Sequence, residues 1–131
     1  MERLIGIPYE DRGRSLEGAD CWGLARLACE MLTGKDLPDY LSTYVTAEAP
    51  EQVGKAFAEQ QKDEARYAPV KRGEERAGDI VLINIAGWPA HCGVVVRPGF
   101  MIHTLQGHDS ALERYRITKW ERRIHGFWRP I

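Results

Sequence analysis

Residues 79–105 read DIVLINIAGWPAHCGVVVRPGFMIHTL, and this stretch decides the fold. Three short apolar runs, at 79–85, 91–96 and 100–105, have the length and the β-branched content of strands. The tripeptide RPG between the last two runs indicates a hairpin turn. The stretch therefore predicts the centre of an antiparallel sheet, to which the mixed apolar and basic residues at 112–131 add one or two strands.

A helix precedes the sheet in the chain. Asp20 can cap it, because an aspartate carboxylate accepts a hydrogen bond from an unpaired N–H of the first turn. Apolar residues recur behind it at helical spacing and Gly34 follows as a C-terminal cap, so the helix is predicted over 21–33. Pro50 suits the start of a second helix, whose narrow apolar stripe predicts a surface position. A helix followed by an antiparallel sheet predicts an α+β domain.

The bulk properties fit one domain of 131 residues, spanning 1–131. Apolar residues make up 44% of the chain, enough for a core, and the net charge of −1 argues against a nucleic-acid binder. No apolar run is long enough to predict insertion into a membrane. The first residues lack a secretory signal pattern, so we expect synthesis and first folding in the cytoplasm. Three cysteines, an odd number, argue against a disulfide framework.

Cys21 is the candidate nucleophile among these free thiols. It begins the predicted helix, where unpaired N–H groups and the helix dipole favour a thiolate. Cys29 lies eight residues further along the same helix, inside its apolar pattern, and is assigned to the core. Cys92 should point away from the face of His91, because side chains alternate along a strand, and it is also assigned to the core.

Two histidines on the predicted hairpin, His91 and His103, form the candidate base and its orienting group. A three-residue loop would pair Val96 with Phe100 and so place Gly93 opposite His103. His91 would then lie diagonal to His103 on the same face, within reach of its imidazole. A two-residue loop would turn His103 to the other face, so the loop length and the two-histidine site are predicted together.

A metal site is the alternative for the same side chains. Cys21, His91, His103 and one further ligand could bind zinc, but the close ligand pairs usual in zinc sites are absent. We therefore predict no metal and no cofactor. The arginines near the C-terminus are interleaved with glutamates, which indicates a solvated face rather than a basic binding patch.

These residues together resemble the NlpC family of papain-like cysteine peptidases, which cut the peptide stems of the bacterial cell wall. Twelve residues separate Tyr9 from Cys21 and twelve separate His91 from His103, and both spacings fit the family. The resemblance covers nearly the whole chain and is carried by five ordered segments: Pro8-Tyr9, Asp20-Cys21-Trp22-Gly23-Leu24, Gly78-Asp79-Ile80-Val81, His91-Cys92-Gly93-Val94-Val95 and Ile102-His103.

The resemblance implies a papain-like core, in which the nucleophile helix packs on a central antiparallel sheet and an extra helix lies at the surface. It implies that Cys21 attacks the scissile carbonyl, that His91 takes and returns the proton, and that His103 orients His91. Asp20 would fix the turn that presents the nucleophile. The implied substrate-binding and oxyanion residues are Tyr9, Asp20 and Trp22.

The sequence departs from the usual family pattern at two places. One bears on where the protein acts, and the other on the shape of the pocket. Trp22 stands where many cell-wall members have serine, and the motif DCWGL, with LPDY at 37–40, resembles the branch of tailed bacteriophages and prophages. That branch implies an endopeptidase of the virion tail tip, cutting next to D-glutamyl in the periplasm or cell wall and targeted by other tail proteins. The segment EDRG at 10–13 replaces the usual paired glycines, so the resemblance does not define that wall of the pocket.

Two other functions are consistent with the same residues. A thiol amidase or acyl transferase acting on a small molecule would use the same nucleophile, and the unusual Trp22 is compatible with it. A non-catalytic tail assembly protein would keep only the shape of the fold, but such a protein has no need of Cys21, His91 and His103 together. A substrate screen separates the small-molecule amidase or acyl transferase from a cell-wall peptidase. The reactivity of Cys21 towards a thiol probe tests the non-catalytic tail assembly protein.

Overall fold

The structure is a computed structural model that describes residues 2–131. Within these residues, two α-helices and eight strands are joined by turns and two 3-10 helices. In chain order the elements are η1 (Glu2–Leu4), β1 (Arg14–Ser15), β2 (Gly18–Ala19), α1 (Cys21–Thr33), α2 (Pro50–Gln60), β3 (Tyr67–Val70), β4 (Ile80–Ile85), β5 (Trp88–Arg97), β6 (Phe100–His103), β7 (Ala111–Arg114), η2 (Glu121–Arg123) and β8 (Ile124–Pro130).

Six strands form one antiparallel sheet in the order β3-β8-β4-β5-β6-β7. This confirms the α+β prediction, and the C-terminal segment, for which one or two further strands were expected, forms β7 and β8. The strand β3 was not predicted from the sequence. It is short, carries Pro69 and forms an edge of the sheet, where proline is tolerated because one side of the strand needs no ladder hydrogen bonds.

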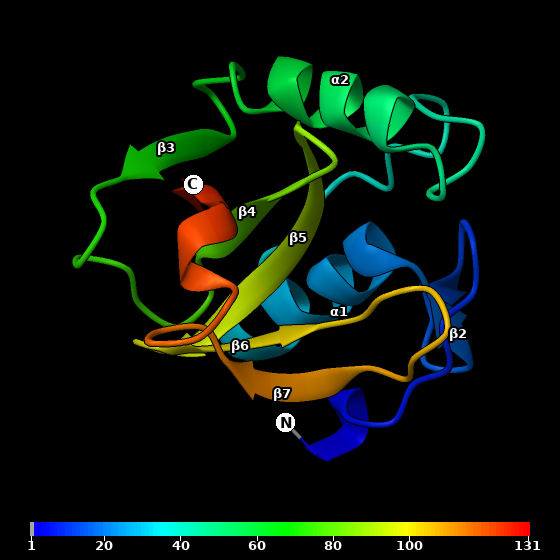
Figure 1. The fold of residues 1–131 in the computed structure, drawn as a ribbon, viewed down its shortest axis with the longest axis horizontal. Coiled ribbons are helices and arrows are strands. Elements are labelled where there is room, and N and C mark those ends of the chain that lie inside the picture. Colours follow the sequence, from blue (N-terminus) through cyan, green and yellow to red (C-terminus); the bar gives the residue numbers. More distant parts are fainter. Residues whose placement is uncertain (1) are drawn as a thin grey trace.

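The helix α1 has the predicted bounds and both predicted caps. The Asp20 carboxylate accepts a hydrogen bond from the Gly23 N–H, and Gly34 ends the helix with a left-handed φ of 74°. In Figure 1, α1 lies against β5 and β6, while α2 covers the end of the sheet near the β4–β5 turn. No helix within residues 2–131 is long and apolar enough to span a membrane.

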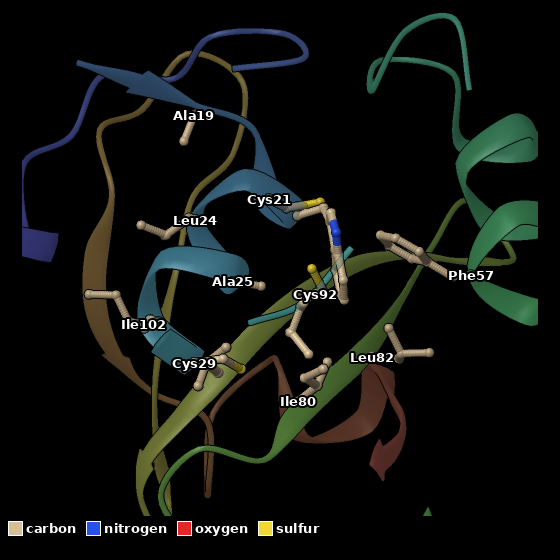
Figure 2. Close-up of a cluster of buried hydrophobic side chains, with 14 of the residues drawn as sticks. Ala19, Cys21, Leu24, Ala25, Cys29, Phe57, Ile80, Leu82, Cys92 and Ile102 are labelled. Carbon is tan, nitrogen blue, oxygen red and sulfur yellow. The ribbon is translucent and has the colours of Figure 1, made fainter. Parts of the chain in front are cut away.

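Alternation along β5 sorts its residues between two buried clusters, one on each face of the sheet. Figure 2 shows the cluster beneath α1, in which Cys29 and Cys92 are packed with apolar side chains of the helix and the sheet. Both thiols are fully buried, which confirms their assignment to the core. His91 belongs to the opposite set of β5 residues, and the cluster on that side contains Val95 and Trp120.

The β5–β6 hairpin has the predicted register at Gly93 and His103, but its turn differs from the predicted one. The prediction of a three-residue loop is wrong, because Arg97 pairs directly with Phe100 around a two-residue Pro98-Gly99 turn. The next pair is Val95 with Met101, so Val96 is an extra residue, a β-bulge. The bulge restores the alternation that a two-residue turn would have inverted, and Gly93 lies opposite His103 as predicted.

Gly23 in the first turn of α1 packs against a backbone carbonyl. A Cβ added there would lie 2.0 Å from the Gly13 carbonyl oxygen, which cannot move without displacing the loop before the helix. Replacing a helical glycine by alanine usually stabilises by about 1 kcal/mol. We expect Gly23→Ala instead to lower the free energy of unfolding by about 2 kcal/mol or more, from overpacking.

Urea denaturation of Gly23→Ala checks this expectation. The control is Glu30→Ala, at an exposed position of the same helix, which should change stability by less than about 0.5 kcal/mol. A Gly23→Ala protein as stable as the wild type would contradict the close approach of the two segments.

Candidate active site

A pocket of about 160 Å³ opens at the N-terminal end of α1. It is lined by Cys21 from the helix, His91 from β5 and Tyr9 from the segment before β1. The loop before α2 and the loop after β6 supply further walls, including Glu48 and Gln106, whose side chains are hydrogen bonded to each other. The structure therefore brings three of the sequence-predicted site residues to one cavity.

Cys21 begins α1, so its thiol lies beside the unpaired N–H groups of the first helical turn. The residue is 8% exposed. Burial, followed by the neighbouring Cys21, raises the Cys92 pKa well above its ordinary value. Within residues 2–131, no hydrogen bond joins Cys21 to His91.

His91 and His103 are joined by a hydrogen bond of 2.9 Å between His91 Nε2 and His103 Nδ1. Their rings lie 5.1 Å apart, centre to centre, and both residues are buried. Gly93 lies opposite His103 in the ladder, and a Cβ there would come within 3.2 Å of the His103 Cβ. The missing side chain leaves room for the diagonal contact that the hairpin register predicts.

Glu113 on β7 makes a second diagonal contact, with His103. The sequence analysis did not identify Glu113 as a site residue. His103 pairs with Ala111, and Glu113, two residues further on, places its Oε1 3.0 Å from His103 Nε2. The other carboxylate oxygen accepts a hydrogen bond from the Trp120 indole N–H. The signal that could have found Glu113 is the same alternation, counted across one more strand.

Both imidazoles are neutral at neutral pH. Burial, followed by the charge of His103, lowers the pKa of His91 to about 3. Burial also lowers the pKa of His103, against the opposing effect of the Glu113 carboxylate. Burial and then the nearby Cys21 raise the pKa of Tyr9, so its hydroxyl stays protonated beside the thiol. The pocket therefore contains an uncharged base and an uncharged hydroxyl.

Asp20 is fully buried and does not line the pocket. Besides capping Gly23, its carboxylate forms an ion pair of 2.7 Å with Arg14 and accepts hydrogen bonds from the Tyr44 hydroxyl and the Arg12 backbone N–H. These contacts tie the segment before the helix to its first turn, which fits the expected role of fixing the turn before Cys21.

The structure does not bring Trp22 into the Cys21 pocket. Its side chain is 3% exposed, and its indole N–H donates to the Pro38 carbonyl at 2.8 Å. The ring packs between Tyr40 and Phe57 and borders a separate hollow. Trp22 points towards α2 and the loop before it, which differs from the substrate contact expected from its place next to the nucleophile.

The unusual segment at 10–13 holds one wall of the pocket. The Asp11 carboxylate accepts hydrogen bonds from the Thr46 hydroxyl and the Ala47 N–H, and Arg12 donates to two backbone carbonyls of the same loop. These contacts fix the loop that carries Ala47 and Glu48 into the pocket. Across residues 2–131, no group of three or more histidine, cysteine or acidic side chains is arranged to bind a metal.

Known proteins resemble this chain both in sequence profile and in fold. The sequence profile of the NlpC/P60 family matches residues 6–129. The NlpC/P60 domain of the peptidoglycan hydrolase SagA has a similar fold, with a TM-score of 0.61 and 21% identity over 99% of this chain and 92% of that one. No curated protein matches the sequence.

Two longer proteins contain the same fold. A lipoprotein-like NLP/P60 protein from Staphylococcus aureus has a TM-score of 0.64 at 19% identity, and an NlpC/P60 protein from Bacillus cereus has 0.64 at 17%. The alignments cover 100% and 95% of this chain but only 40% and 35% of those proteins. This chain therefore spans well under half of their length.

The buried neutral histidines predict a loss of stability in mild acid. As the pH falls through about 6.5, histidines of the unfolded chain bind protons, whereas folded His91 does not until about pH 3. Protonation thus favours the unfolded state across this window, and the free energy of unfolding should fall by up to about 1.4 kcal/mol per pH unit for His91.

Urea unfolding at pH 7.5, 6.5 and 5.5 measures this slope while most carboxylates remain ionised in both states. His91→Gln should give a shallower slope, because it removes one of the protons taken up on unfolding. Equal slopes in the wild type and this variant would show that His91 is not buried in its neutral form.

Proposed function

Because the chain belongs to the NlpC/P60 family, we propose that it is a cysteine peptidase of peptidoglycan, with Cys21 as nucleophile, His91 as base and His103 as orienting group. The observation that carries the proposal is the shared pocket. Cys21 lies there at a capped helix N-terminus, beside a neutral imidazole whose Nε2 is already held by His103. This arrangement leaves Nδ1 of His91 as the nitrogen available to the thiol.

The reaction follows from these positions. His91 takes the proton of Cys21 as the sulfur attacks the scissile carbonyl carbon, and the backbone N–H of Cys21 can stabilise the oxyanion. The C–N bond then breaks, and His91 returns the proton to the leaving amine. A water, deprotonated by His91, hydrolyses the thioester, releases the acid and restores the thiol.

Two changes accompany the attack. The Cys21 thiol forms a hydrogen bond with His91 that the resting structure lacks, since catalytic hydrogen bonds often form only in the substrate complex. A thiolate beside His91 then raises the pKa of the imidazole, because an opposite charge within a few ångströms favours the protonated form. The low pKa of His91 in the resting protein therefore keeps the base free without preventing proton transfer.

The substrate that fits the family is the stem peptide of peptidoglycan, cut next to its D-glutamyl residue. A structural neighbour is described as a peptidoglycan hydrolase, and the DCWGL motif supports a setting in a bacteriophage tail tip, with tail proteins as partners. In that setting, the protein is made in the bacterial cytoplasm, is carried by the virion and acts in the periplasm or cell wall. Its presence in purified tailed particles, measured by mass spectrometry, tests this part separately.

Release of stem-peptide fragments from purified sacculi tests the chemistry. We expect Cys21→Ala to abolish release, because it removes the nucleophile, and His91→Asn to lower kcat by roughly 10²–10⁴-fold, the usual contribution of a general base. Mass spectrometry of the fragments identifies the bond that is cut.

The matched control is Cys29→Ala, which removes another buried thiol from the same helix, with folding checked by circular dichroism. It should retain activity. Full release by Cys21→Ala would refute the proposal. If the wild type is inactive on sacculi but turns over small thioesters or amides through Cys21, the small-molecule hydrolase is the better assignment.

A further inference from the structure

We propose that Glu113 is a positioning residue that sets the tautomers of His103 and His91 through one line of hydrogen bonds. The inference rests on the proposed roles of Cys21 and His91, and it extends the site by a residue on the neighbouring strand. Glu113 lies on β7, which pairs with β6 but not with the strand that carries His91.

The line runs across three adjacent strands. Glu113 Oε1 lies 3.0 Å from His103 Nε2, and His103 Nδ1 lies 2.9 Å from His91 Nε2. Small residues make both diagonal contacts possible, since Gly93 and Ala111 are the two ladder partners of His103 on either side. Both ring nitrogens of His103 are therefore hydrogen bonded.

The direction of each hydrogen bond follows from the carboxylate at the end. An ionised carboxylate only accepts, so His103 must carry its proton on Nε2. Its Nδ1 then has no proton and must accept, so His91 must donate from Nε2. A neutral imidazole has one N–H, so His91 Nδ1 is left with a free lone pair. Glu113 thus fixes which nitrogen of His91 can act as the base.

Two features keep the Glu113 carboxylate ionised and in place, so that it accepts the hydrogen bond from His103. Although its partial burial acts to raise the pKa of the carboxyl, the hydrogen bonds from His103 and Trp120 lower it below its ordinary value. Trp120 also packs its ring against both imidazoles, with centroids 5.1 Å from His103 and 5.9 Å from His91. The indole therefore holds the carboxylate and both rings in place.

Lys119 is a positive charge that acts on both His103 and Glu113. It acts to lower the pKa of His103 and so disfavours an imidazolium there, whereas the Glu113 carboxylate acts to raise that pKa. Glu113 thus opposes the effect of Lys119 on His103.

Nitrogen-15 NMR of the imidazoles in the reduced, full chain tests the proposal directly. In the wild type we expect a proton on Nε2 of both histidines and none on either Nδ1. A proton on Nδ1 of His91 would overturn the proposal without any substitution. The measurement needs no substrate, so its failure is distinct from a failure to cleave peptidoglycan.

Glu113→Gln tests whether the Glu113 carboxylate sets the tautomers of the two histidines. Its one amide oxygen would accept from Trp120, so the amide NH₂ would face His103 and reverse both tautomers. We expect kcat to fall by roughly 10²–10⁴-fold, the contribution of a general base, with KM little changed. Alkylation of Cys21 by iodoacetamide at pH 7 should slow in parallel.

Adding Trp120→Phe to Glu113→Gln should restore the wild-type tautomers, because it frees the amide oxygen for His103. Glu121→Gln removes a neighbouring carboxylate from the adjacent 3-10 helix and should leave tautomers and rates unchanged. Wild-type tautomers and thiol reactivity in Glu113→Gln would overturn the proposal, as would a double variant that keeps reversed tautomers.

Discussion

The buried carboxylate of Asp20 joins three parts of the chain around the N-terminal end of α1. It caps the first turn of α1 through Gly23, pairs with Arg14 of β1, and binds Tyr44 of the long loop before α2. Because a buried charge without partners is costly, these contacts must form together. The position of Cys21, one residue further along, is therefore determined by the same group that fastens the surrounding loops. A residue first considered for substrate binding instead determines where the nucleophile stands.

The sheet supplies the histidines of the site and Glu113 through one diagonal contact that is repeated from strand to strand. His91, His103 and Glu113 come from three consecutive strands of a meander, each diagonal to the next and separated by a residue with little or no side chain. Such an arrangement tolerates no shift of register, because a shift of one residue would turn a histidine to the face of α1. The bulge at Val96 is thus as important for the site as the histidines themselves.

Much of this site could be predicted from local patterns, and the remainder depends on contacts between distant segments. The bounds of α1, the core positions of Cys29 and Cys92, and the opposition of Gly93 and His103 follow from caps and alternation, which are properties of adjacent residues. The bulge could not be predicted, because a turn and a bulge together give the same register as a longer loop. Glu113 was missed because residues 104–110 separate β6 from β7, and a loop of that length does not define which residues of the two strands pair. The place of Trp22 depends on Pro38 and α2, which no periodicity in the sequence connects to it.

The position of β8 between β3 and β4 has a consequence for how the protein is made. The strands β4, β5, β6 and β7 follow one another and pair as neighbours, so they can assemble from nearby parts of the chain as it is synthesised. In contrast, the partner of β3 within residues 2–131 is β8, which follows all the other strands of the sheet in the chain, so β3 must wait for it. Contacts of such long sequence separation form slowly. We therefore expect the meander that carries the histidines to assemble early, and the far edge of the sheet to close only after translation has passed Pro130.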